Sequence, residues 1–327
     1  MQTICILEIK MKLIKKIRAA AAAAVTALLL ASCGQAPPQS GKISVVCTVF
    51  PIYDWTVNIA GENADVTLLN DRGTDMHSFE PSAADLAAIA DCDVFIYIGG
   101  ESDKWVTKAL TLSGNKKRQV ITLSRLPGNE LIKEQHTEGM TDTGHGEEEP
   151  EDDEHIWLSL KNSAYLCGEI AKTLENADPP HADSYSANAE DYISRLVSLD
   201  GEYSAAAEKA KHKTLVIADR FPFAYLFHDL GLSYYAAFPG CSAETGASFY
   251  TVAFLAKKTD ELGLDTVITT ENPVKGIADA VIGNTVSGHK RVSVLDSMQS
   301  VTVKQIENGA SYIGIAKRNL EVLKCVF

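Results

Sequence analysis

The sequence has little positive charge. It holds 30 Lys and Arg residues against 43 Asp and Glu residues, for a formal net charge of −13. This balance argues against nucleic acid as a partner, because phosphate backbones select basic surfaces. Hydrophobic residues make up 46% of the chain and charged residues 22%, so the composition excludes global disorder. A chain of 327 residues is long enough for two domains.

Two kinds of metal-binding motif are also missing: closely spaced cysteine pairs and the helical histidine pair of metalloproteases. The chain has seven Cys and neither a CxxC nor an HExxH pattern. A zinc–thiolate site is therefore not expected, and a zinc hydrolase is disfavoured because it needs an open metal position with a general base beside it. Cys47 and Cys92 stand in apolar runs and are predicted to be buried as small hydrophobic residues. We expect a binding protein rather than an enzyme.

The N-terminal segment reads as a targeting signal. From Met11 the chain runs MKLIKKIRAAAAAAVTALLLASC, a basic stretch followed by an apolar stretch of residues 19–30, which is too short for a membrane span. The end of this segment, LASC, resembles a bacterial lipobox, in which Cys33 would become the lipid-bearing first mature residue. We predict a lipoprotein signal peptide over residues 1–33 and a tether over 34–41, with a plain secretory signal as the alternative.

The remaining chain alternates apolar strand patterns with helical patterns. Strands are predicted at 42–50, 64–69, 93–98 and 119–123, and again at 214–218, 233–238, 265–269 and 291–295. This alternation is typical of parallel sheets covered by helices on both faces. The sequence therefore predicts an α/β fold with an N-terminal lobe over residues 42–180 and a similar C-terminal lobe over residues 212–327.

A long helix is predicted between the lobes, over residues 181–211. Tyr185, Tyr192, Leu196, Leu199 and Tyr203 recur there at helical spacing. Such a helix is long enough to run along both lobes. A single helical tie resists twisting, so we expect local rearrangement rather than a large hinge closure.

An acidic segment precedes this helix in the N-terminal lobe. Residues 134–154 hold ten acidic residues, His136 and His145, and neither Lys nor Arg. Like charges at this density predict an extended, mobile loop. Histidine among carboxylates indicates weak and exchangeable capture of metal ions, although a solvated loop without function has the same pattern.

Four polar residues lie at predicted strand or helix boundaries, where ligand sites of open α/β sheets form. His77 stands in DRGTDMHSFEP before a helix, and His155 in EHIWLSL is expected to open a helix. Asp219 in ADRFP and Asp296 in LDSM follow strands of the second lobe. Two neutral imidazoles with a carboxylate suit a borderline divalent cation such as Zn²⁺.

Several of these motifs resemble those of one family. MHSFEPSAAD and EHIWLSL are similar to the two N-lobe metal motifs of the cluster A-I substrate-binding lipoproteins, which are the zinc and manganese receptors of bacterial ABC importers. LDSM followed by SYIGIAKRNLEVLK resembles their C-terminal ligand and closing helix, and FPGCSAETGAS resembles a C-lobe loop that carries Glu, here Glu244. The resemblance implies two α/β lobes joined by one long helix, with a metal between the lobes.

The same resemblance implies a ligand set of His77, His155 and Asp296. Two positions depart from the family pattern. Leu160 stands where the family usually has Pro, and Arg220 stands where it has His or Glu. Arg stays protonated and cannot bind a metal, so Asp219 or water is expected to fill that position, and Arg220 is expected to pair with Glu244 or Asp219.

The resemblance implies a monomeric, lipid-anchored receptor on the outer face of the cytoplasmic membrane. It would capture Zn²⁺ and pass it to the membrane permease of an ABC transporter. Mn²⁺ is the alternative cargo, because the site lacks a third histidine. A surface adhesin is a further alternative, which rests on exposure outside the cell alone.

Overall fold

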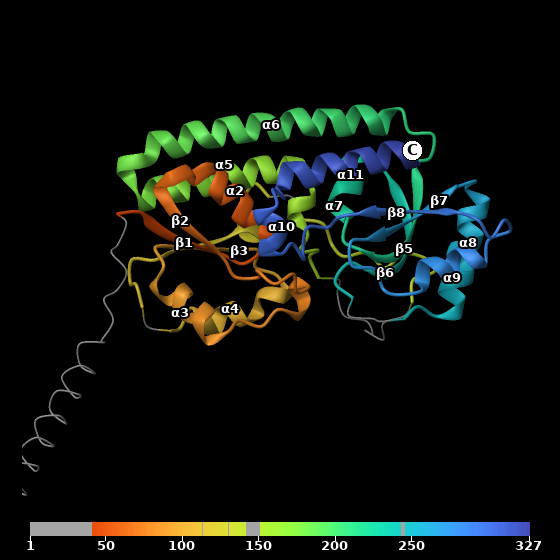
Figure 1. Cartoon of the computed structure of the whole chain (residues 1–327), viewed down its shortest axis with the longest axis horizontal. Coiled ribbons are helices and arrows are strands. Elements are labelled where there is room, and N and C mark those ends of the chain that lie inside the picture. Colours follow the sequence, from red (N-terminus) through yellow and green to blue (C-terminus); the bar gives the residue numbers. More distant parts are fainter. Residues whose placement is uncertain (1–40, 113, 130, 142–150, 243–245) are drawn as a thin grey trace, which may run out of the picture. The chain divides into compact units, whose positions relative to one another are not determined.

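The computed structural model describes residues 41–112, 114–129, 131–141, 151–242 and 246–327. Contacts divide the chain into the units Met1–Lys42 and Ile43–Phe327, and the second of these carries the whole fold described below (Figure 1). The predicted signal segment and Cys33 lie outside the described residues. No described helix combines the length and the apolar character needed to cross a membrane.

The first lobe is built on a four-stranded sheet with the order β2-β1-β3-β4. All of its strands pair in parallel. Its strands are β1 (Ile43–Cys47), β2 (Ala64–Leu68), β3 (Val94–Tyr97) and β4 (Gln119–Thr122), and its helices are α2 (Phe50–Ala60), α3 (Ala83–Asp91), α4 (Lys104–Ala109) and α5 (Leu160–Ala177). Helices cover both faces of this sheet (Figure 1), as buried parallel strands require.

The second lobe repeats this plan. Its sheet has the order β6-β5-β7-β8 and is again parallel throughout. Its strands are β5 (Thr214–Phe221), β6 (Ser233–Pro239), β7 (Thr266–Thr270) and β8 (Arg291–Leu295), and its helices are α7 (Ala224–Leu230), α8 (Phe249–Glu261), α9 (Ile277–Gly283) and α11 (Tyr312–Val326). The short helix α10 (Val303–Glu307) lies beside the first lobe, where the Val303 backbone N–H donates to Asp71 (Figure 1). The expected fold of two similar α/β lobes is therefore confirmed.

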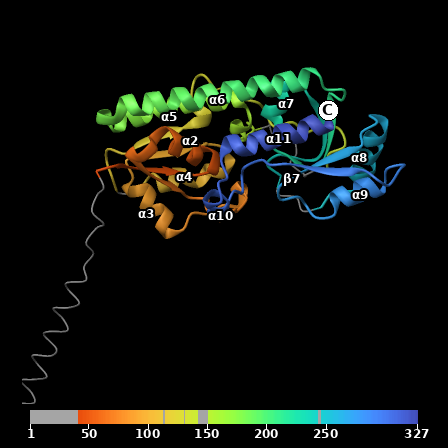
Figure 2. The same ribbon diagram turned by 45° about the horizontal axis from the view of Figure 1, so that its top comes forward.

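A single long helix, α6 (Ala182–Glu208), runs along both lobes (Figures 1 and 2). Its buried stripe contains the predicted tyrosines and leucines. The Tyr192 hydroxyl donates to Asp54 of α2 at 2.8 Å, and the Tyr203 hydroxyl donates to the carbonyl oxygen of Ala316 in α11 at 2.6 Å. The helix thus binds elements from both ends of the chain, and the predicted helical connection is confirmed.

The two lobes also share one hydrophobic core. Buried residues of both sheets and of α5, α6 and α11 belong to a single cluster. Trp55 of α2 meets Tyr312 of α11 edge to face, with ring centroids 5.2 Å apart. Because α11 packs against α2, the lobes are held together by more than the linking helix α6.

Two local predictions differ in detail from the structure. His155 opens a helix as predicted, but this is a short 3-10 helix, Ile156–Leu158, and the α-helix α5 begins only at Leu160 after a Ser159 cap. β5 continues to Phe221, so Asp219 and Arg220 lie within the strand rather than after it. A register shift between Ile217 and Arg220 lets the strand continue with its side chains reoriented.

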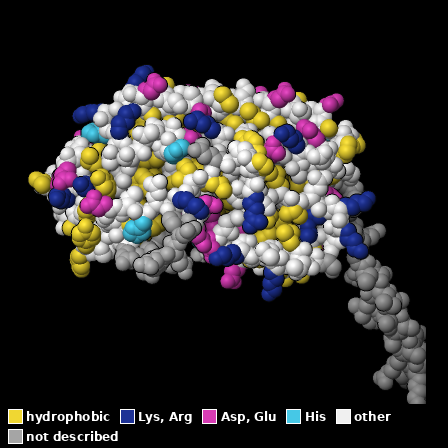
Figure 3. All heavy atoms as spheres, turned by 180° about the vertical axis from the view of Figure 1, so that it is seen from behind, with side chains coloured by type: hydrophobic (Ala, Val, Ile, Leu, Met, Phe, Trp, Pro, Cys, Tyr) yellow, Lys and Arg dark blue, Asp and Glu magenta, His cyan; other side chains and the backbone are white. Residues whose placement is uncertain are grey.

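The described surface is mixed in charge. On the face shown in Figure 3, basic and acidic side chains are interspersed and hydrophobic side chains are scattered. Cys47 and Cys92 are buried as predicted, and all five cysteines that the structure describes have free thiols.

Candidate metal centre

His77 sits in a short 3-10 turn, Met76–Ser78, that follows β2. Asp75 caps this turn, because its Oδ1 accepts a hydrogen bond from the His77 backbone N–H at 3.0 Å. The ring Nε2 of His77 is buried and has no hydrogen-bond partner. Burial and the neighbouring His155 lower the pKa of His77. The ring is therefore neutral at neutral pH, which is the form that binds metals.

His155 is fully buried just before the turn that leads into α5. Asp153 holds it twice: its Oδ1 lies 2.8 Å from both the backbone nitrogen and the ring Nδ1 of His155. A carboxylate at Nδ1 assigns the proton to that nitrogen and leaves the lone pair on Nε2. Burial lowers the pKa of His155, but the carboxylates of Asp153, Glu154 and Glu134 together raise it, so that the net pKa lies above its ordinary value.

The two imidazoles form a pair. Their ring centroids are 5.5 Å apart, and the Nε2 atom of each ring is buried without a partner. Trp157, whose ring lies 5.2 Å from His155, donates from its indole nitrogen to the backbone oxygen of Ser297 at 2.8 Å. This hydrogen bond joins the segment that carries His155 in the first lobe to Ser297 in the second lobe, the residue that follows Asp296.

The second lobe places the acidic side chains of Asp296 and Glu271 next to Ser297, the partner of Trp157. Asp296 follows β8, and its Oδ1 accepts from the backbone N–H of Met298 at 2.9 Å. Met298 is the one non-glycine residue with positive φ (64°) in the part of the chain that the structure describes. Such backbone strain is concentrated at functional sites. Burial raises the pKa of Asp296.

Glu271, at the end of β7, was not predicted from the sequence. It accepts from the backbone N–H and the hydroxyl of Ser297, at 2.8 and 2.7 Å. Burial and the nearby Asp296 raise the pKa of Glu271 to about 7. The rule that selected Asp296, a polar residue directly after a strand, reaches Thr270 after the predicted strand 265–269, and it reaches Glu271 only with the observed end of β7 at Thr270.

Asp219 is fully buried and points toward β7. Its carboxylate accepts hydrogen bonds from the backbone and hydroxyl of Thr270, at 2.9 and 2.6 Å, and from the backbone N–H groups of Arg220 and Val274, at 2.9 and 3.3 Å. A metal would have to displace some of these donors. The role of Asp219 as a ligand stays a prediction.

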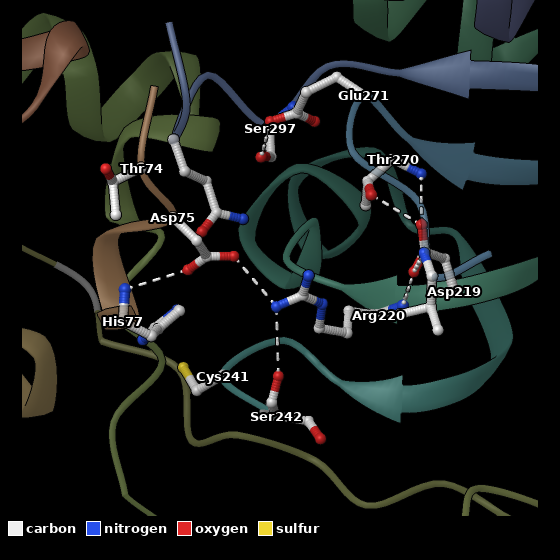
Figure 4. A network of polar contacts seen from close by, with 12 residues as sticks. Thr74, Asp75, His77, Asp219, Arg220, Cys241, Ser242, Thr270, Glu271 and Ser297 are labelled. Carbon is white, nitrogen blue, oxygen red and sulfur yellow. Dashed lines mark hydrogen bonds and ion pairs between the residues drawn. The ribbon is translucent and has the colours of Figure 1, made fainter. Parts of the chain in front are cut away.

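Arg220 reaches across to the first lobe (Figure 4). Its Nη1 lies 3.0 Å from Oδ2 of Asp75 and also donates to the backbone oxygen of Ser242 at 3.3 Å. The expected partner Asp219 receives only the backbone N–H of Arg220, so that prediction is wrong for the guanidinium. The other expected partner, Glu244, lies outside the described residues.

These side chains do not form a preassembled cage. Among the residues that the structure describes, no group of three or more His, Cys, Asp and Glu side chains lies close enough to hold one metal ion. The structure brings His77 and His155 together. Asp296 and Asp219 are held in the second lobe by other contacts, and their joining the histidines in one site stays a prediction.

The structure describes the two flanks of the acidic loop, residues 134–141 and 151–154. Its described flanks pack on the second lobe: the Thr141 backbone N–H donates to Ala237 at 3.0 Å, and Oε1 of Glu134 accepts from Cys241 at 2.8 Å. These contacts place both flanks against neighbouring elements, and the mobility of the loop stays a prediction. His136 is exposed, and His145 lies outside the described residues.

The fold and the buried histidine pair define the class: a two-lobed solute-binding protein with a candidate metal site between its lobes. The family model described as the periplasmic component A of the zinc-uptake complex, ZnuA, matches residues 45–326. The chain belongs to this family, as its motifs predicted.

Individual relatives agree with this assignment. The chain is 32% identical over 306 residues to the zinc-binding lipoprotein AdcA of Streptococcus pneumoniae strain R6, covering 92% of this chain and 59% of AdcA. It therefore spans somewhat more than half the length of that relative. It is 27% identical to the high-affinity zinc uptake system protein ZnuA of Bacillus subtilis strain 168, covering 91% of this chain and 93% of ZnuA.

A solved structure shows the same likeness. The Zn(II)-bound ZnuA-like domain of Streptococcus pneumoniae AdcA superimposes with a TM-score of 0.70 at 30% identity. The match covers 88% of this chain and 99% of that domain. The similarity thus lies in the part of AdcA that corresponds to one complete two-lobed unit.

Proposed function

We propose that this chain is a receptor that captures Zn²⁺ outside the cytoplasm and delivers it to the membrane permease of an ABC importer. The observation that carries the proposal is the pair His77 and His155, with rings 5.5 Å apart and both Nε2 atoms buried without partners. Buried acceptors are normally hydrogen-bonded, and two on neighbouring rings without partners fit a bound cation.

Zinc is favoured over manganese by ligand chemistry and by the relatives. Imidazole nitrogen suits Zn²⁺, whereas Mn²⁺ prefers an oxygen-rich set. The relatives carry zinc in their names, and the domain of AdcA was crystallised with Zn(II). Mn²⁺ remains the alternative that the competition experiment below addresses.

The proposed ligands are His77, His155 and Asp296. Asp153 orients His155 in the way that carboxylates orient zinc-binding histidines. Asp296 would complete the set if it gave up its contact with the Met298 backbone. Asp219 is the weaker candidate, because its oxygens already serve four donors.

The chain is further proposed to act as a monomer held at the outer face of the membrane through lipid on Cys33. The lipobox-like sequence supports this anchor, as does the description of AdcA as a lipoprotein. Replacing Cys33 by Ala should move the protein from the membrane fraction into the medium. Continued membrane association of that variant would refute the anchor.

Metal analysis of the purified protein tests the cargo. We expect elemental mass spectrometry to find one tightly held Zn²⁺ per chain after dialysis, and excess Mn²⁺ not to displace it. Retention of Mn²⁺ in preference to Zn²⁺ would overturn the choice of metal. Retention of neither would overturn the receptor function.

A further inference from the structure

Arg220 and Asp75 form an ion pair that connects the two lobes beside the candidate metal centre. Arg220 comes from β5, and Asp75 caps the turn that carries His77. Their side chains are 22% and 27% exposed, so the pair is shielded from most of the solvent screening that weakens surface ion pairs.

The two oxygens of the Asp75 carboxylate have different partners. Oδ1 accepts from the His77 backbone, and Oδ2 lies 3.0 Å from Nη1 of Arg220. In Figure 4 the Asp75 carboxylate lies between His77 and the guanidinium. The group that shapes the histidine turn is therefore the same group that neutralises the arginine.

A guanidinium at this place has an electrostatic consequence for any cation that binds His77. Like charges a few ångströms apart repel strongly when they are partly buried. Asp75 bonds the guanidinium through Oδ2 and the His77 backbone N–H through Oδ1, so the positive charge of Arg220 lies beside the turn that presents the imidazole. A divalent ion would experience the field of this charge with twice the charge of a proton.

We propose that the Asp75–Arg220 ion pair sets the affinity of the site for zinc, with Arg220 weakening metal binding and Asp75 cancelling most of that effect. Arg220 thus tunes the affinity of the site through its charge and not as a ligand. This proposal rests on the zinc-receptor function proposed above, and deepens it.

A double-mutant cycle on the full chain separates charge from structure. Asp75→Asn removes the charge but keeps an oxygen that can cap the turn, because Asn is as good an N-cap as Asp. Arg220→Gln removes the opposing charge, and Arg220→Lys keeps it. The zinc dissociation constant of each protein is measured by competition with a chromophoric chelator, and metal-free thermal unfolding is followed in parallel.

We expect Asp75→Asn to weaken zinc binding at least tenfold, because it leaves the guanidinium uncompensated. Arg220→Gln should tighten binding at least threefold. The double variant should return to within threefold of the unmodified chain, and Arg220→Lys should stay there too. Arg195→Gln on α6, whose side chain is exposed, removes the same charge at a distance and serves as the control with unchanged affinity.

Other outcomes overturn the proposal. If Asp75→Asn and Arg220→Gln both weaken binding and the double variant does not recover, the pair is only a mechanical link between the lobes. If neither changes the affinity of a chain that binds zinc, the ion pair is irrelevant while the receptor function stands. If the unmodified chain binds no zinc, both proposals fail. If Asp75→Asn does not fold, the zinc affinity of Arg220→Gln still tests the proposal, because weaker binding by that variant would contradict it.

Discussion

The two lobes share a strand order but differ in how they prepare their side chains for a metal. The first lobe presents His77 and His155 with free, buried Nε2 atoms. In the second lobe the corresponding strand ends carry side chains that already have partners, such as Arg220 with Asp75 and Glu271 with Ser297. The N-terminal lobe is ready for a ligand, whereas the C-terminal lobe has contacts to exchange.

This difference indicates an order of events. A metal would meet the histidine pair first, since rigid, desolvated donors bind with little ordering cost. The second lobe would follow by releasing contacts of Asp296, which lies beside the strained Met298. Because the lobes share a core and α6 spans both, this second step is expected to be local rather than a large hinge motion.

The largest expected effect comes from removing a donor of the first lobe. His155→Ala should weaken zinc binding by at least about 100-fold, since even outer residues that orient a ligand are worth about 10- to 100-fold. Isothermal titration with zinc and a competing chelator measures this change. His228→Ala is the matched control, because His228 is exposed on α7. Equal affinity of both variants would show that the histidine pair is not the site.

An intermediate effect distinguishes the carboxylates of the second lobe. Asp296→Asn should weaken zinc binding about tenfold while leaving metal-free stability nearly unchanged. Asp219→Asn should instead lower the free energy of unfolding by about 2 kcal/mol, since its amide hydrogens would oppose the Thr270 donors. Affinity titrations and urea unfolding of both variants separate the roles. The reverse pattern would make Asp219 the ligand.

Sequence reasoning reached the elements of the fold and the histidine pair because both follow local rules. Strand runs, the helical stripe of α6 and the motifs around His77 and His155 can be read within short windows. The ion pair could not be read in this way: Asp75 and Arg220 are 145 positions apart, and their contact depends on how the lobes pack. The extension of β5 past Asp219 depends likewise on a register shift that pairing with β6 creates.

A smaller effect concerns pH, since each lobe holds a buried carboxyl group with a raised pKa. Burial, helped by the charge of Glu154, raises the pKa of Asp103 in the first lobe from 3.8 to about 6. The folded state then holds a proton that the unfolded state releases, so stability falls as pH rises from about 4 to about 6. The loss is at most about 3 kcal/mol, since one pKa unit is worth about 1.4 kcal/mol.

Asp103→Asn should flatten this part of the stability profile. Urea unfolding of the metal-free protein at several pH values between 4 and 7 measures the change. Asp91→Asn, at an exposed position of α3, should leave the slope as it is. An unaltered slope in Asp103→Asn would assign the pH dependence to other groups, with Glu271 of the second lobe the first to test.

The smallest expected effect is that of shortening the acidic loop, which joins the two lobes through its flanks. The deletion is confined to residues 142–150, because Thr141 and Glu134 bond to the second lobe and their loss would disturb it. We expect the tight zinc ion to remain with its affinity unchanged within about threefold. The density of like charges predicts an extended loop, and ordering such a chain around an ion costs about 1 to 2 kcal/mol per residue, so we expect sites within it to be weak. Calorimetric titration should therefore lose only weakly bound zinc, whereas loss of the tight ion would make His145 a ligand and give the candidate centre a donor from the loop.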